Sequence, residues 1–293
     1  MKIVTIDNGI LKAQISSFGA ELISVEKDGE QRIWDGNPKF WEGHSPVLFP
    51  ICGCLLDGYY EYDGKKYELQ PHGFASRSEF EVVSEEKTSA TFLLKASEET
   101  KKVYPFDFEF RVHFKLDGDK LCVYYIVENK GNKTLYCNVG CHEGYALDGK
   151  LEDYYILFEG EKSVLNTLYG ERLLEDDKKE MELNNGKLQL SMKNHEGEFI
   201  NNGVLCYNDS IIIENIKNKK LTLLKGDEPK IDIYYADFDH LVIWTACDGF
   251  IAIEPWNGLP DAYNTNHKLE DKKSIDKVDP KSSKTYYHSI IFN

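Results

Sequence analysis

Hydrophobic and polar positions alternate along much of the chain, which is the pattern of half-buried β-strands. The clearest case is the run FEFRVHF at positions 108–114, where apolar and polar residues alternate without a break. Other β-rich runs occupy residues 59–62, 91–94 and 121–127. His113 lies on the polar side of its run, so it is predicted to face solvent and to have no catalytic role.

Turn signals separate these runs at short intervals. Asn-Gly or Asp-Gly pairs, which tolerate the positive φ angles of tight hairpins, occur at positions 8–9, 28–29, 57–58, 63–64, 117–118, 185–186 and 248–249. Helical periodicity is scarce: residues 97–102 predict a short helix that Pro105 ends. The sequence therefore predicts an all-β fold, a large antiparallel β-sandwich.

The chain contains no internal repeat and no long linker, so residues 1–293 are predicted to form one domain. Hydrophobic residues make up 41% of it and aromatic residues 13%, which is enough for a large packed core. The charged run 175–180 is predicted to be an exposed loop, and residues 264–283 a solvated loop before a final strand at 286–292.

The formal net charge of −15 opposes binding to nucleic acid or to anionic lipid surfaces, so a neutral small molecule is the expected partner. The N-terminus lacks the apolar region of a signal peptide, and no stretch approaches the ~20 apolar residues that a membrane helix needs. We expect a cytoplasmic protein without membrane partners, either a monomer or a homodimer.

The seven cysteines favour a reducing compartment, because an odd number cannot all pair within the chain. Cys52 and Cys54 are too close for a usual zinc pattern; in a strand, Cys137 and Cys141 would share one face while His142 points to the other. Buried free thiols are therefore predicted instead of a metal site. The chain has no P-loop, no GxGxxG at a strand–helix junction and no GxSxG elbow, so no cofactor is expected.

Three titratable residues form a candidate acid–base set. Glu254 ends an apolar run, where burial would raise its pKa toward the range of a general base, and Trp256 beside it offers a flat apolar face suited to a sugar ring. His72 in the segment PHGFA (71–75) and His142 in VGCHEGY (139–145) could exchange protons near neutral pH. Taken singly, each could be structural: a paired acid, a turn histidine or a core histidine.

With the segment PVLFPI at 46–51 upstream, the order of these motifs resembles the aldose 1-epimerase (mutarotase) family, in its LacX-like branch, over nearly the whole chain. The resemblance implies a β-supersandwich that interconverts the α and β anomers of a sugar by opening the ring. It implies that Glu254 is the base and His142 the acid, while His72 binds the sugar and helps to hold the developing negative charge. Trp256 would line the pocket and Asp261 would bind hydroxyl groups.

The sequence departs from the family pattern at three positions. Relatives often carry arginine where this chain has Cys54 and Ser76, and Arg77 follows one position late. On a strand Arg77 would point to the opposite face, yet it remains a candidate for substrate binding. The second histidine of the family is commonly followed by proline; here Glu143 follows and could orient His142 or change its pKa.

The leading interpretation is an aldose 1-epimerase acting on a free hexose. The first alternative is a hexose-6-phosphate epimerase of the same fold, but only four arginines occur in an acidic chain, so a neutral sugar is predicted. The second alternative is a non-catalytic carbohydrate-binding or sensing protein. A glycosidase would need a second carboxylate, for which only Asp261 or Glu143 offers itself.

Overall fold

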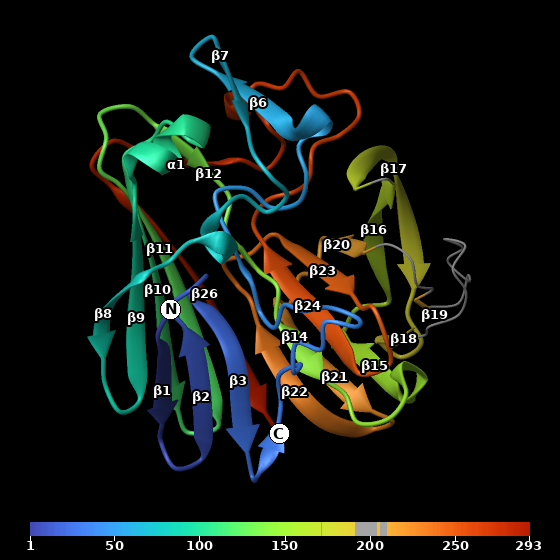
Figure 1. Cartoon of the computed structure of the whole chain (residues 1–293). Coiled ribbons are helices and arrows are strands. Elements are labelled where there is room, and N and C mark those ends of the chain that lie inside the picture. The colour runs from blue at the N-terminus through green and yellow to red at the C-terminus, as the bar shows by residue number, and fades with distance from the viewer. Residues whose placement is uncertain (171, 191–203, 206–209) are drawn as a thin grey trace.

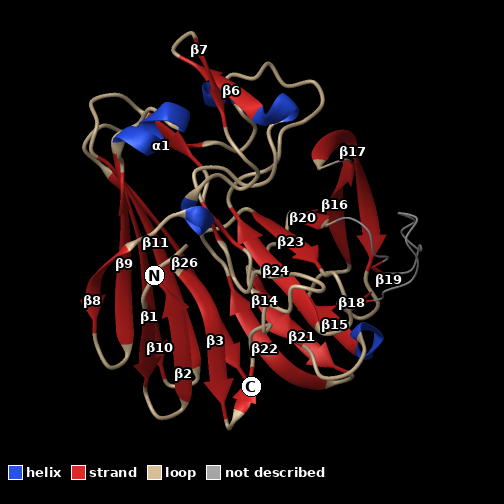
Figure 2. Cartoon of the chain, in the orientation of Figure 1, coloured by secondary structure: helices blue, strands red, loops and turns tan. Residues whose placement is uncertain are grey.

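The computed structural model describes residues 1–170, 172–190, 204–205 and 210–293 (Figure 1). Antiparallel sheets dominate it, and its few helices are short (Figure 2), which confirms the all-β prediction. The largest sheet has ten strands in the order β19 (Val204–Leu205), β18 (Lys187–Leu190), β15 (Tyr154–Leu157), β21 (Lys220–Lys225), β22 (Glu228–Tyr234), β26 (Ser283–Phe292), β11 (Lys120–Asn129), β10 (Phe108–Asp117), β9 (Ser89–Lys95) and β8 (Glu81–Glu85).

A second sheet of eight strands positions most of the candidate site. Its order is β17 (Leu173–Glu182), β16 (Ser163–Gly170), β20 (Ile211–Glu214), β23 (His240–Trp244), β24 (Phe250–Trp256), β13 (Gly140–Cys141) and β5 (Val47–Leu48), and β14 (Gly144–Ala146) also pairs with β24. β24 is buried along its whole length. A side chain on this strand is therefore shielded from bulk water on either face of the sheet.

Smaller elements complete the described chain. The minor sheets are β1 (Ile3–Asp7), β2 (Leu11–Ser16), β3 (Glu21–Lys27) and β4 (Glu30–Gln31); β6 (Tyr59–Tyr62) with β7 (Lys65–Glu68); and β12 (Leu135–Cys137) with β25 (Asp276–Val278). The helices are α1 (Glu98–Val103) and the 3₁₀ turns η1 (Leu56–Gly58), η2 (Ala75–Arg77), η3 (Leu151–Asp153) and η4 (Leu269–Asp271). None of the helices in the described ranges is both long and apolar enough to cross a membrane.

Local sequence signals explain several of these elements. The pairs Asp28-Gly29, Asp63-Gly64 and Asn185-Gly186 adopt positive φ at both residues and join successive strands, as predicted. Ser97 caps α1 by accepting a hydrogen bond from the backbone N–H of Thr100, and the helix ends before Pro105.

The main core confirms the alternation found in residues 108–114. The apolar side chains of that run are buried on β10, and the ring of Phe110 stacks on Phe49 with 4.4 Å between ring centroids. His113 lies on the other face, half-buried, with its Nδ1 atom 2.8 Å from the hydroxyl of Thr91. The outward orientation of His113 was therefore predicted correctly.

Two loop predictions are wrong. Residues 175–180 belong to β17, an edge strand whose charged side chains are mostly exposed; charge on an edge strand discourages pairing with other chains, and the same charge suggested a loop. Residues 264–283 contain η4 and β25, and Lys272 within them is buried. Its ammonium lies 2.6 Å from the Asp261 carboxylate, so this charged segment is anchored in the interior.

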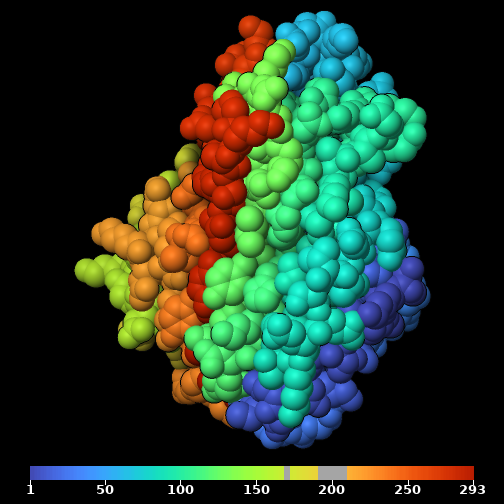
Figure 3. Space-filling model, turned by 90° about the vertical axis from the view of Figure 1, so that its left-hand side faces the viewer, coloured from blue at the N-terminus to red at the C-terminus, as the bar shows by residue number. Residues whose placement is uncertain are grey.

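The strand β26 joins the two halves of the ten-stranded sheet. It pairs with β11 on one side and with β22 on the other. Figure 3 shows this segment in red between the orange and green parts of the chain. His288 on β26 is wholly buried, so this strand also contributes a polar side chain to the interior.

Candidate active site

A cleft of about 460 Å³ opens over the eight-stranded sheet, a volume in the range of small-molecule sites. Strands β5, β23 and β24 line it, together with the segments 41–54 and 71–77, with His142 between β13 and β14, and with Arg172 between β16 and β17. The lining residues are Trp41, Pro46, Leu48, Cys54, Pro71, His72, Ser76, Arg77, His142, Arg172, Ser210, Trp244, Glu254 and Trp256. The structure thus brings Glu254, both candidate histidines, Trp256 and Arg77 to one cavity.

Glu254 lies on the central strand β24 with 1% of its side chain exposed. Burial raises the pKa of its carboxyl well above the ordinary value of 4.5, the negative charge of Glu143 adds to that shift, and the indole of Trp256 opposes it. A carboxylate that holds its proton so firmly is a stronger base than an exposed one.

His142 lies on the strand segment next to β24, directly opposite Glu254. Gly140 pairs with Trp256 and Gly144 pairs with Ala252, so the register between these pairs sets residue 142 opposite residue 254. The His142 Nε2 atom is 3.4 Å from the Oε2 atom of Glu254. Cross-strand registration therefore brings the predicted acid and the predicted base side by side.

Aromatic rings enclose the His142 imidazole. Its ring centroid is 4.9 Å from that of Trp41, 5.7 Å from that of Trp244 and 5.9 Å from that of His72. Burial lowers the pKa of His142 to about 3, so the imidazole is neutral at neutral pH and can donate a proton from only one nitrogen. Sequence reasoning missed Trp41 and Trp244, because nothing in their local sequence marks them as cleft residues.

The backbone fixes the tautomer of His72. The N–H of Gly53 donates to His72 Nδ1 at 3.2 Å, so Nδ1 must be the unprotonated nitrogen and Nε2 carries the hydrogen. Burial, followed by the charges of Arg77 and Arg172, lowers the pKa of His72 to about 4. His72 is therefore a neutral hydrogen-bond donor to the cleft.

The glycine after His72 is required by the fold. Both residues have positive φ, 64° for His72 and 74° for Gly73, and a Cβ atom on Gly73 would lie 2.2 Å from the Phe49 carbonyl oxygen. Glycine at position 73 thus allows the loop that carries His72 to pack closely against the backbone of Phe49.

Two arginines reach the cleft. Arg77 ends the 3₁₀ turn η2 and is not on a strand, so the expectation that it points away is wrong; its Nη2 atom donates to the carbonyl oxygens of Pro71 and Gly73 at 3.0 and 2.7 Å. Arg172, which sequence reasoning missed, lies between β16 and β17 and interacts with the thiol of Cys54. Its local sequence is an ordinary charged turn, and only the fold reveals its place.

Asp261 lies outside the cleft lining. Its carboxylate is 5% exposed, is paired with Lys272, and accepts a hydrogen bond from the backbone N–H of Leu56 at 3.0 Å. These partners occupy the oxygen atoms that hydroxyl binding would need. The arrangement favours a structural role for Asp261.

The charged residues of the cleft lining are Glu254, Arg77 and Arg172. With Glu254 ionised they sum to one positive charge, in contrast to the −15 of the whole chain. The cleft therefore offers cationic donors within an otherwise acidic protein.

The sequence comparisons agree with this architecture. The pattern of the aldose 1-epimerase family matches residues 2–267, and the chain belongs to that family. The plasmid-encoded protein LacX of Lactococcus lactis is 30% identical over 308 residues, covering 99% of each chain. A putative glucose-6-phosphate 1-epimerase of Escherichia coli is 29% identical over 127 residues, 40% of each chain.

Solved structures extend the likeness to the whole fold. A galactose mutarotase-related enzyme from Lactobacillus acidophilus superposes with a TM-score of 0.89 at 31% identity, covering 100% of this chain and 97% of that one. A galactose mutarotase-like protein from Lactobacillus casei gives a TM-score of 0.90 at 25% identity, with both chains fully covered. These structures confirm the mutarotase-like sandwich predicted from the sequence.

Proposed function

We propose that this protein is an aldose 1-epimerase that interconverts the α and β anomers of a hexose by acid–base ring opening. The observation that carries the proposal is the cross-strand pair of His142 and Glu254 in a cleft with tryptophan walls. Tryptophan faces suit the apolar side of a sugar ring, and the pair supplies the two proton-transfer groups that the reaction needs.

In the proposed reaction Glu254 removes the proton of the anomeric hydroxyl while His142 donates its Nε2 proton to the ring oxygen. The C1–O5 bond breaks and leaves an aldehyde and a new hydroxyl group. Rotation about C1–C2 exposes the other face of the aldehyde, and the reverse proton transfers close the ring to the other anomer. The Nε2–H group of His72 would hydrogen-bond a sugar oxygen and stabilise the developing negative charge.

A second candidate substrate is a phosphorylated hexose. Two of the four arginines in the chain line the cleft, so the small number of arginines argues less strongly for a neutral sugar than the sequence suggested. Guanidinium groups form charge-assisted hydrogen bonds to phosphate. The partial likeness to the putative glucose-6-phosphate 1-epimerase of Escherichia coli supports the same candidate.

The deciding experiment measures anomerisation of three sugars under one buffer and ionic strength, because salt screens the phosphate contribution. Polarimetry follows freshly dissolved α-glucose and α-galactose, and exchange NMR follows glucose 6-phosphate; Glu254→Gln is the control. We expect acceleration by the wild type over the spontaneous rate. A higher kcat/KM for the phosphate ester would select the second candidate, whereas sugar binding without acceleration would select a carbohydrate-binding protein.

A further inference from the structure

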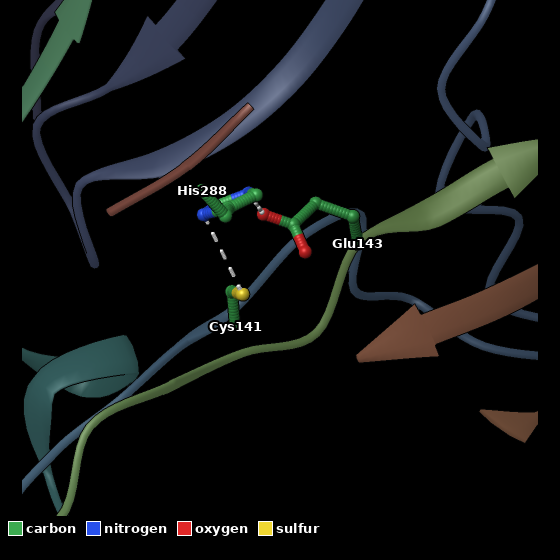
Figure 4. Close-up of side chains that lie close together, drawn as sticks. All are labelled: Cys141, Glu143 and His288. Atoms are coloured by element: carbon green, nitrogen blue, oxygen red, sulfur yellow. Dashed lines mark hydrogen bonds and ion pairs between the residues drawn. The ribbon is translucent and has the colours of Figure 1, made fainter. Parts of the chain in front are cut away.

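A buried polar cluster lies behind the cleft, on the opposite face of the strands that carry the proposed acid and base. It comprises Cys141, Glu143 and His288, which lie close together (Figure 4). These residues are 1%, 3% and 0% exposed. Cys141 and Glu143 flank His142 in the sequence, so alternation turns their side chains away from the cleft. His288 comes from β26 of the other large sheet.

The His288 ring lies between its two partners. Its Nε2 atom is 2.9 Å from Oε1 of Glu143, and its Nδ1 atom is 3.9 Å from the Cys141 sulfur (Figure 4). A metal ion would need one ring nitrogen directed at both other ligands. Because each nitrogen faces a different residue, the ring bridges Glu143 and Cys141 by close polar contacts.

The same cluster holds the backbone on both sides of Glu254. The N–H of Ile253 donates to the Glu143 carbonyl oxygen at 3.2 Å, and the Cys141 thiol donates to the Pro255 carbonyl oxygen at 3.3 Å. Both peptide neighbours of Glu254 are thus bound to residues whose side chains meet His288. A shift of this cluster would move the Glu254 carboxylate relative to His142.

The cluster also adds a negative charge close to Glu254. Glu143 Oε2 has no hydrogen-bond partner among the described residues, and its carboxylate is buried, so its field is poorly screened. The titratable groups around Glu254 are His142 and Glu143 from the neighbouring strand segment and the thiols of Cys52 and Cys141. His72, Arg77 and Arg172 line the same cleft. His142 is neutral, which leaves Glu143 as the acidic neighbour of Glu254.

We propose that Glu143, held by His288 from the opposite sheet, is a positioning residue that sets the orientation and the basicity of Glu254. The proposal rests on the proposed function, because basicity matters only if Glu254 accepts a proton. It gives a role to Glu143, which follows His142 where relatives commonly have proline. The buried carboxylate behind the sheet disfavours a second negative charge in front of it, so Glu254 binds its proton more firmly.

The test compares the pH profile of kcat/KM for wild type and Glu143→Gln, which removes the charge and keeps the shape. We expect the acidic limb to move to lower pH by on the order of one unit, because the repulsion is lost. The carboxyl ¹³C NMR signal of Glu254, titrated without substrate, should shift its midpoint in the same direction. Glu143→Asp, which keeps the charge, should retain the wild-type midpoint, as should the surface control Glu128→Gln.

A second variant guards against misfolding of the first. His288→Leu removes the imidazole that faces the Glu143 carboxylate; an unpaired buried carboxylate then takes up a proton and loses its charge. The Glu254 midpoint should therefore fall in this variant too. Equal NMR midpoints in wild type and folded Glu143→Gln, or an unchanged midpoint in His288→Leu, would overturn the inference. A wild type without turnover that still shows the NMR shift would instead overturn only the proposed function.

Discussion

The Glu254 side chain combines a chemical advantage with a cost in stability. Its buried carboxyl binds a proton more tightly in the folded than in the unfolded chain, because burial and the charge of Glu143 raise its pKa. The folded state therefore loses stability as the pH rises from 4.5 to the raised pKa that Glu254 has in the folded chain. The feature that makes Glu254 a base thus weakens the fold at neutral pH.

Glu254→Gln should separate these two effects. Turnover should fall by on the order of a hundredfold or more, because glutamine cannot accept the proton. The free energy of unfolding at pH 8 should rise, by about 1.4 kcal/mol for each unit by which burial raises the pKa, and the gain should vanish below pH 4. Polarimetry and urea denaturation at both pH values measure the two quantities; equal rates in mutant and wild type would eliminate Glu254 as the base.

The two histidines of the cleft should respond differently to truncation. His142→Ala removes the proposed proton donor and should lower kcat, whereas His72→Ala removes a binding donor and should raise KM at least as much as it lowers kcat. Steady-state kinetics on the sugar chosen by the substrate comparison would show the difference. A KM effect alone for His142→Ala would reverse the assignment of the two roles.

At this scale the sequence indicated the residues that sit in recognisable motifs. Glu254, His142 and His72 were found because each has unusual neighbours in the sequence. One example is Gly73 after His72, where a Cβ atom would clash with the Phe49 carbonyl oxygen. Arg172 and His288 could not be found in the same way. Both reach their places through long-range pairing of strands, which leaves no local signature.

Among the elements, the segment 264–283 is anchored by a buried ion pair. The Lys272 ammonium and the Asp261 carboxylate are 3% and 5% exposed and lie 2.6 Å apart. Removing one member leaves the other buried and unpaired, which is far costlier than losing a surface salt bridge. This contact also explains why a charged sequence folds inward here instead of forming the predicted solvated loop.

Lys272→Met should therefore destabilise the protein by about 3–5 kcal/mol. The double variant Lys272→Met with Asp261→Asn should recover part of that loss, because no buried charge then remains unpaired. Chemical denaturation of wild type, both single variants and the double variant gives the coupling free energy. Additive effects would show that the pair contributes nothing beyond its separate members.

Strand prediction succeeded where alternation was regular, as on β10, and failed where charge dominated. β17 carries the run Glu175–Glu180 on an exposed edge, so its sequence lacks the apolar face that identifies a strand. The helix α1 was recognisable from its cap and from Pro105. Local signals therefore predicted interior strands and caps better than edges.

For the whole molecule, buried neutral histidines make stability depend on acid pH. Burial lowers the pKa of His72 and of His240, each to about 4 from 6.5. At these two sites the unfolded chain binds more protons than the folded one between these values. The stability that the neutral histidines contribute is therefore fully present above pH 6.5 and is lost as the pH falls toward 4. Each histidine should contribute about 1.4 kcal/mol of loss per pH unit within that window.

His240→Gln tests this dependence away from the cleft, since His240 is not among the lining residues and its Nε2 atom bonds the hydroxyl of Ser274 at 3.2 Å. The slope of unfolding free energy against pH between 6 and 4.5 should fall by about 1.4 kcal/mol per unit relative to wild type. Urea denaturation at a series of pH values measures it. An unchanged slope would mean that His240 is as readily protonated in the folded chain as in the unfolded one.

The place of β26 has a consequence for how the chain folds during synthesis. This strand is the latest of the described strands to leave the ribosome, yet it lies between β11 and β22, which are translated well before it. Until residues 283–292 emerge, the ten-stranded sheet is divided in two, with two open edges that can pair with other nascent chains. His288 arrives on the same strand, so the buried cluster behind the cleft is also completed only then.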